Sequence, residues 1–197
     1  MASMYTYIRE QGNVLRDIVE RRKDILEPVV DLFKENHIDS IVTVGSGSSY
    51  NAITSSRYFL QKILGIEVKT CFPYSFNHYE QVFSKDSMVI GISQTGSSAG
   101  TVDALKKARD EGAHTLALTA YGDAPLTKVA DRTLIIACGD EESDFKTKGY
   151  TSTILTFLLM ALEVGLAEEK LGKEEYDEYI QELLSIANAY DELIDKA

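Results

Sequence analysis

Short apolar segments that alternate with helix-length segments constrain this chain more than any other feature. Within the helix-length segments, the spacing of the apolar residues is typical of helices, and glycines stand at several of their ends. Strands that alternate with helices form a parallel sheet that is covered on both faces. We therefore predict an α/β fold: a three-layer, doubly wound sheet of five parallel strands in the flavodoxin-like order 2-1-3-4-5. The predicted strands are residues 41–44, 67–72, 87–92, 114–119 and 132–137.

The helices expected between the strands cover 50–64, 99–111 and 124–130, while 74–83 is either a loop or a short helix. Before the sheet, apolar residues at steps of three and four predict two helices within 4–36 that meet near Asp24, because Pro28 is tolerated only in a first turn. Asp24 and Glu27 have capping-box spacing there. After the sheet we expect a polar loop, a long apolar helix and an amphipathic helix, over 139–147, 150–171 and 173–196. This divides the chain into N-terminal helices (1–36), a central sheet domain (37–171) and a C-terminal amphipathic helix (172–197).

The charge of the chain limits its partners. With 31 acidic and 20 basic residues, the net charge is −11, which argues against nucleic acid and anionic membranes. Residues 168–197 hold ten of the acids and three of the bases, so the remaining body carries only −4. No uninterrupted apolar run reaches the length of a membrane helix and no signal peptide is evident, so we expect a cytoplasmic protein.

Cysteine and histidine usage bears on redox state and metals. Cys71 and Cys138 both lie in apolar, strand-like stretches, which indicates buried thiols in a reducing compartment rather than a disulfide framework. The three histidines are not paired at metal-ligand spacing. We expect neither a metal nor an organic cofactor.

Two polar loops follow the first and third predicted strands. Residues 45–49 read Gly-Ser-Gly-Ser-Ser, and residues 93–98 read Ser-Gln-Thr-Gly-Ser-Ser. In the order 2-1-3-4-5 the ends of strands one and three flank the ligand crevice of the sheet. A strand-to-helix junction offers free backbone N–H groups and favours an anion. The alternative is that Ser97 or Ser98 only caps a helix.

A dinucleotide is a poor match to these loops. Tyr50 stands where the third glycine of a G-x-G-x-x-G motif belongs, and the second strand ends without the acid that holds a ribose. No G-x-x-x-x-G-K-[ST] motif is present. Hydroxyls suit phosphate oxygens, and the amide of Gln94 suits sugar hydroxyls. The loops therefore favour a small phosphorylated sugar.

Three segments, 45–51, 93–98 and 146–151, together resemble the signature segments of the SIS (sugar isomerase) domain family. The likeness is greatest to the first SIS module of the isomerase half of glucosamine–fructose-6-phosphate aminotransferases and to fructosamine deglycases. Residues 8–11, Ile-Arg-Glu-Gln, also resemble the entry helix of that group, although Gly12 stands where proline is usual. The resemblance covers about residues 5–165.

This resemblance implies roles for individual residues. Ser93, Gln94, Thr95 and Ser98 would hold the phosphate. Gly47, Ser48 and Ser49 would contact the sugar. Two departures from the family pattern are Thr95, where serine is commoner, and Ser97-Ser98, where an acid–threonine pair is usual. From its charge, Lys148 is a further candidate for the ligand site, with an exposed surface lysine as the alternative.

Interconversion of an aldose and a ketose requires a base and an acid. We assign these catalytic roles to Glu141 and Glu142, with the alternative that they only stabilise the start of the following helix. The other titratable candidates near the crevice are Asp144, Lys146, Lys148 and His78.

The predicted function is a phosphosugar-binding domain of a sugar-phosphate isomerase or of a sugar-phosphate amine deglycase. The alternative is a non-catalytic binding or sensing module, or one half of a tandem enzyme. The resemblance implies that, in family members with two SIS modules in tandem, the second module supplies the main catalytic glutamate. Residues 154–166 are apolar nearly all round a helix, so this helix is either deeply buried or shared with a partner. We favour a shared helix, with a homodimer or a second SIS module as partner.

Overall fold

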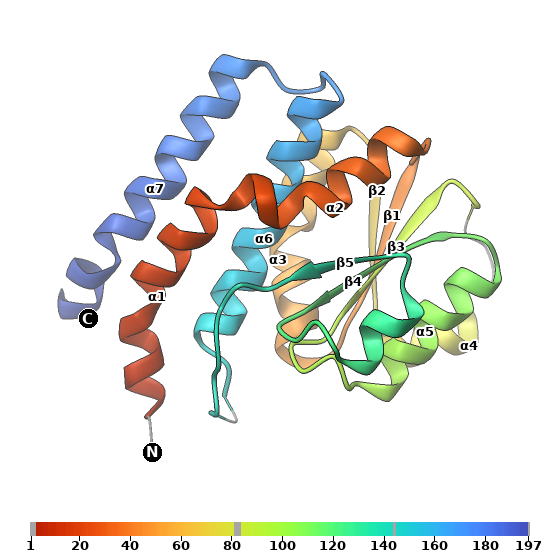
Figure 1. The fold of residues 1–197 in the computed structure, drawn as a ribbon, viewed down its shortest axis with the longest axis horizontal. Coiled ribbons are helices and arrows are strands. Elements are labelled where there is room, and N and C mark those ends of the chain that lie inside the picture. The colour runs from red at the N-terminus through yellow and green to blue at the C-terminus, as the bar shows by residue number, and fades with distance from the viewer. Residues whose placement is uncertain (1–2, 81–83, 144, 197) are drawn as a thin grey trace.

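A parallel sheet lies at the centre of the computed structural model, which describes residues 3–80, 84–143 and 145–196 (Figure 1). The strand order is β2-β1-β3-β4-β5, and every neighbouring pair is parallel. This confirms the predicted fold class and order. The strands are β1 (Ser40–Val44), β2 (Glu67–Cys71), β3 (Ser87–Ile92), β4 (His114–Thr119) and β5 (Arg132–Ile135).

Helices cover both faces of the sheet, because successive strand side chains point to opposite sides and both sides are apolar. Ile41 and Ile90 belong to the core under α2, α3 and α6, while Val42 and Val89 belong to the core under α4 and α5. The helices are α1 (Met4–Glu20), α2 (Arg22–Glu35), α3 (Gly47–Leu64), α4 (Pro73–Tyr79), α5 (Ala99–Asp110), α6 (Lys148–Ala167) and α7 (Lys173–Lys196), with a 3-10 turn, η1, at Pro125–Val129.

Helix α6 is long and apolar enough to cross a membrane by length and composition, and it is the one such helix in the described ranges. It packs against α1, α2 and α3, and 67% of its most apolar stretch is buried inside the fold. Burial on this scale is what a core helix of a soluble domain requires. Most of the apolar surface of α6 is therefore buried against other helices of the same chain.

Helices α1 and α7 lie side by side at one end of the molecule (Figure 1). Gly12 permits this approach, because a Cβ there would lie 3.2 Å from the Ala187 carbonyl oxygen and 3.2 Å from the Tyr190 Cβ. The buried Gln11 side chain accepts hydrogen bonds from Thr151 Oγ1 and Tyr190 Oη, both at 2.8 Å. One amide thus joins α1, α6 and α7.

The two predicted helices are present, but they meet at Arg21, slightly before Asp24: α1 ends at Glu20 and α2 begins at Arg22. Pro28, expected in a first turn, lies inside α2 instead. The capping box does not form, since Arg21 is the N-cap and makes no side-chain cap hydrogen bond. The first residue of α2 makes one local and one tertiary contact. Arg22 donates to the Val19 carbonyl at 2.8 Å and pairs with Glu163 of α6 at 3.1 Å.

Most other ends of helices and strands differ from their predicted positions by one to four residues. The helix expected from residue 50 begins at Gly47, so three residues predicted as loop form the first turn of α3. Gly65 has φ +67 and ends α3, as expected of a C-cap. The ambiguous segment 74–83 holds all of α4 but its first residue, and its residues 81–83 fall outside the described part of the chain. Segments 87–92, 114–119 and 173–196 match their predictions.

Candidate functional site

The loop that follows β3 is held rigidly by the neighbouring strand. The Gly96 N–H donates to the Ser93 carbonyl at 2.9 Å, and the Ala120 N–H, just beyond β4, donates to the Gln94 carbonyl at 2.9 Å. Gly96 has φ +65, and a Cβ there would lie 2.3 Å from the Ala124 Cβ. Only glycine fits both this backbone conformation and this close approach. The hydroxyls that follow are therefore carried on a fixed turn.

Two helix N-termini flank the crevice and lack side-chain caps. Ser46 is the N-cap of α3 and Ser98 is the N-cap of α5, yet neither makes a side-chain cap hydrogen bond. The Ser98 hydroxyl instead accepts from Thr101 Oγ1 at 3.1 Å. Thr95 and Ser97 hydrogen-bond to each other at 2.8 Å. Ser98, the N-cap residue, thus does not use its side chain as a cap, and the first backbone N–H groups of both helices remain available to an anion.

A third helix, α6, has its N-terminus occupied from within the chain. One oxygen of the Glu141 carboxylate accepts from the Thr147 N–H at 2.6 Å and the Thr147 hydroxyl at 2.7 Å. Its other oxygen accepts from the Gly149 N–H at 3.0 Å. Burial acts to raise the pKa of Glu141, but these hydrogen bonds outweigh it and hold the pKa below its ordinary value. Glu141 is therefore a charged group that fastens the loop before α6.

Gln94 connects the loop after β3 to the start of α6. Its Nε2 donates to Glu141 Oε2 at 3.4 Å and lies 3.9 Å from Cys138 Sγ. The carboxamide also lies directly over Gly149, where a Cβ would come within 2.3 Å of Nε2. The position of the Gln94 carboxamide thus depends on the absence of a side chain at residue 149.

Lys148 is buried rather than exposed. Its ammonium group donates to Glu10 Oε2 of α1 at 2.6 Å and lies 4.9 Å from the centre of the Tyr7 ring. The Tyr7 hydroxyl accepts from the backbone N–H of Glu142 at 3.1 Å, while the Glu142 side chain is exposed. Helix α1 therefore supports the loop that carries both predicted catalytic acids.

The predicted residues fall into three groups. Ser93, Thr95 and Ser98 lie on the loop between β3 and α5. Gln94, Glu141 and Lys148 gather around the start of α6, and Gly47, Ser48 and Ser49 form the first turn of α3. Lys146 donates to the Glu141 carbonyl at 2.8 Å. His78 lies on α4 against Tyr74 instead. Asp144 lies outside the described residues.

Sequence reasoning missed the partners of these groups. Tyr7 and Glu10 are distant in the sequence from Glu142 and Lys148, and no local pattern links them. Gly149, in contrast, stands within a signature segment, and its glycine identity was an available sign of close packing.

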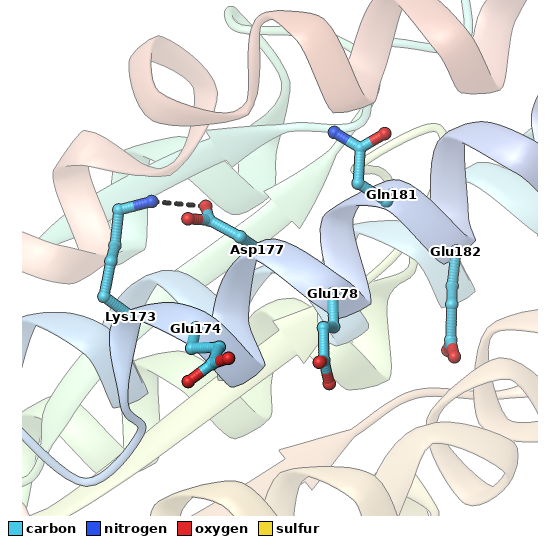
Figure 2. Close-up of a pocket in the computed structure, with 6 residues that line it drawn as sticks. All are labelled: Lys173, Glu174, Asp177, Glu178, Gln181 and Glu182. Atoms are coloured by element: carbon cyan, nitrogen blue, oxygen red, sulfur yellow. Dashed lines mark hydrogen bonds and ion pairs between the residues drawn. The ribbon is translucent and has the colours of Figure 1, made fainter.

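A hollow of about 810 Å³ lies elsewhere, along α7 (Figure 2). Glu174, Glu178 and Glu182 point from one side of the helix, and Lys173 pairs with Asp177 on the other. Four acids against one paired lysine disfavour an anionic ligand. This hollow is also remote from the strand ends, so we do not take it as the candidate site.

Cys71 and Cys138 are buried free thiols, as predicted. Burial raises the pKa of both thiols, so neither has thiolate character at neutral pH. No three His, Cys, Asp or Glu side chains within the described ranges converge as a metal site.

Comparison with protein families matches residues 33–163 to the SIS domain. Among curated proteins, the glutamine–fructose-6-phosphate aminotransferase (isomerizing) of Fusobacterium nucleatum is 32% identical over 146 residues, which are 74% of this chain and 24% of that protein. The enzyme of the same name from Clostridium tetani is 31% identical over 189 residues, or 93% of this chain and 31% of that protein. The chain thus spans a quarter to a third of these relatives.

Among solved structures, a proposed phosphosugar isomerase from Clostridium difficile 630 matches with a TM-score of 0.89 and 27% identity, over 96% of this chain and 53% of that one. The C-terminal domain of glucosamine-fructose-6-phosphate aminotransferase from Francisella tularensis matches with a TM-score of 0.85 and 21% identity, over 93% of this chain and 53% of that domain. The second likeness shows the fold. This chain corresponds to about half of each structure.

Proposed function

Because the chain belongs to the SIS domain family, we propose that its crevice binds the phosphate of a sugar phosphate. Ser93, Gln94, Thr95 and Ser98 hold the phosphate. Gly47, Ser48 and Ser49, in the first turn of α3, contact the sugar. One observation carries this proposal: two adjacent helix N-termini begin at serines whose hydroxyls make no cap hydrogen bond. An anion placed between them receives backbone N–H groups, hydroxyls and the positive ends of two helix dipoles.

We assign the module to a sugar-phosphate isomerase or a sugar-phosphate amine deglycase. Glu141 and Glu142 remain our candidates for the acid and the base. The hydrogen bonds to both oxygens of Glu141 favour its charged form, which suits a base better than an acid. The exposed carboxylate of Glu142 has freedom to approach a ligand. Lys148 lies behind them, paired with Glu10, and we propose that it contributes positive potential to the sugar site.

The full hydrogen bonding of Glu141 also supports a second candidate function. A carboxylate that is committed to the start of α6 has less capacity to move a proton, so this module binds the sugar phosphate while a partner supplies the base. We propose that this partner is a second SIS module or a second copy of the chain. Buried, free thiols support a cytoplasmic location.

Thermal unfolding of the purified chain with hexose 6-phosphates tests the proposal, with unphosphorylated hexoses as controls. A ligand at 100 times its Kd adds about 2.7 kcal/mol of stability. For a domain of this size, the Tm should rise by roughly 5–10 °C. Ser93→Ala should abolish the shift. Ser55→Ala is the matched control, because its hydroxyl bonds only to the Asn51 carbonyl within α3. Equal shifts with and without phosphate would refute the proposal.

Turnover separates the two candidate functions. Isomerisation or deglycation by the chain alone, lost in Ser49→Ala, supports an enzyme. Binding without turnover supports the module that depends on a partner.

A further inference from the structure

One face of α1 lies against the segment that carries part of the candidate site. Tyr7, Glu10 and Gln11 share that face, because residues three and four apart on a helix are neighbours. The Tyr7 hydroxyl accepts from the Glu142 N–H at 3.1 Å, and the Glu10 carboxylate accepts from the Lys148 ammonium at 2.6 Å. The first contact reaches the loop before α6 and the second reaches the first turn of α6. The position of α1 therefore bears on the geometry of the site.

Gln11 joins this face to α7 through a single atom. Its side chain is 4% exposed, and its Oε1 accepts from the hydroxyls of Thr151 in α6 and Tyr190 in α7, both at 2.8 Å. A carbonyl oxygen has two lone pairs, so these two donors use its whole capacity. The hydrogen bond from Nε2 to the Ile8 carbonyl is long, at 3.5 Å. The two hydroxyls, from two different helices, therefore contribute most to the position of the carboxamide.

The Thr151 hydroxyl has one proton and three acceptors within reach. Besides Gln11 Oε1 at 2.8 Å, the carbonyls of Lys148 and Thr147 lie 3.2 and 3.4 Å away. A threonine that donates to the carbonyls one turn back often bends its helix. The short hydrogen bond to Gln11 draws the proton away from those carbonyls. If Gln11 is displaced, the proton returns to them, which gives the first turn of α6 a second arrangement.

The first turn of α6 is also where groups of the site meet. The Gly149 N–H donates to Glu141 Oε2 at 3.0 Å, and the Gln94 carboxamide lies directly over Gly149. Gln94 Nε2 donates to the same Glu141 oxygen at 3.4 Å. A change in this turn therefore moves Gln94, one of the residues that we assign to the phosphate.

The end of α7 (residues 186–196) is loosely attached to α1. Ile186 and Leu193 are 55% and 56% exposed, so this part of the helix leaves apolar surface uncovered. Asn188 accepts from Arg16 at 2.7 Å, and Asp195 pairs with Arg9 at 2.5 Å. Both contacts lie at the surface, where polar pairs add little stability. Displacement of the end of α7 therefore costs less than unfolding of the core.

We propose that docking of the end of α7 on α1 regulates the affinity of the crevice, with Gln11 as the positioning residue between them. With Tyr190 in place, Gln11 accepts the Thr151 proton, and the first turn of α6 keeps the arrangement seen in the structure. With Tyr190 displaced, this turn and the Gln94 carboxamide shift, and the phosphate is bound more weakly. The inference rests on the proposed function for its ligand, whereas the connection between the helices is independent of it.

Two matched variants test the inference, because each removes one tyrosine hydroxyl from α7. Tyr190→Phe removes a donor to Gln11. Tyr179→Phe is the control, since the Tyr179 hydroxyl accepts from Lys62 of α3 at 2.8 Å instead. Calorimetric titration of the full chain with glucose 6-phosphate and fructose 6-phosphate measures the affinity. We expect Tyr190→Phe to bind about fivefold more weakly, the effect of one hydrogen bond, and Tyr179→Phe to bind as the wild type does.

Hydrogen exchange of the Gly149 amide, followed by NMR without ligand, measures the connection separately. We expect exchange about fivefold faster in Tyr190→Phe and unchanged in Tyr179→Phe. Gln11→Met keeps the length of the side chain and removes the acceptor. In that background Tyr190→Phe should change neither the affinity nor the exchange rate, because the two substitutions break the same connection.

Equal affinities of Tyr190→Phe and Tyr179→Phe would overturn the inference while leaving phosphate binding intact. A full effect of Tyr190→Phe in the Gln11→Met background would do so too, because the connection would then bypass Gln11. If the wild-type chain binds neither sugar phosphate, it is the proposed function that fails. Equal exchange rates of the Gly149 amide in the two tyrosine variants would refute the connection itself, whatever the outcome of the titrations.

Discussion

Replacing Gly149 with alanine tests whether the Gln94 carboxamide is positioned by contact with α6. The new Cβ would lie 2.3 Å from Nε2 and 2.5 Å from Cδ and Oε1 of Gln94, far inside the roughly 3.5–4.0 Å of an ordinary contact. These atoms end a flexible side chain, so the carboxamide moves and α6 stays. The chain then loses the hydrogen bond to Glu141, at a cost of about 1–2 kcal/mol.

We expect the Tm of Gly149→Ala to fall by no more than about 8 °C, while affinity for a hexose 6-phosphate falls by at least about tenfold. Thermal unfolding and calorimetric titration measure the two effects. In a Gln94→Ala background the clash is gone, so Gly149→Ala should be neutral or slightly stabilising. The control is Gly172→Ala, since nothing lies within 4 Å of a Cβ there. An equal stability cost in both backgrounds would refute the reasoning.

Three further changes probe other parts of the molecule. Glu141→Gln should lower the free energy of unfolding by about 2 kcal/mol at pH 7. Because folding lowers the pKa of Glu141, its charge stabilises the fold above the ordinary pKa of glutamate. Urea titrations should therefore show the stabilities of variant and wild type converging as the pH falls through the lowered pKa. Gly96→Ala should cost about 2–4 kcal/mol, because it combines φ +65 with a clash against Ala124; an unchanged Tm would contradict this. Glu163→Gln should lower the free energy of unfolding by about 3 kcal/mol, because it leaves the charge of Arg22 unpaired in a mostly buried position. If the double variant Arg22→Met, Glu163→Leu is no more stable than Glu163→Gln, the lost ion pair is not the cause of the destabilisation.

The alternation of short apolar segments with helix-length segments predicted the sheet, because the central strands β1, β3 and β4 are buried on both faces and their apolar runs are local. The edge strands β2 and β5 are only partly buried. The residues at which helices begin and end were less predictable where residues distant in the sequence make contact. The break between α1 and α2 lies next to Arg22, which pairs with Glu163 of α6 across the fold, whereas Pro28, the residue that suggested a different break, is accommodated within α2. The start of α3 at Gly47 was missed because glycine and serine have low helix propensity.

At the site, topology predicted that the two hydroxyl loops flank one crevice, because the order 2-1-3-4-5 places them there. The side-chain partners could not be predicted, since they join residues distant in the sequence. Lys148 shows this: its charge suggested a ligand contact or an exposed position, and its actual partner, Glu10, comes from α1. The assignments of individual residues to phosphate, sugar and catalysis remain predictions.

The turn at residues 93–96 has a consequence for the thermodynamics of binding. Its Ser93, Gln94 and Gly96 backbone groups form hydrogen bonds within the turn and with Leu118, Ala120 and Leu126. The conformational entropy of this segment is therefore lost during folding, before any ligand arrives. Because the loop is already ordered, little of the interaction free energy is needed to order it when a ligand binds. Association then needs no loop-closing step, and the Gly96 amide hydrogen should exchange slowly with solvent even in the empty protein.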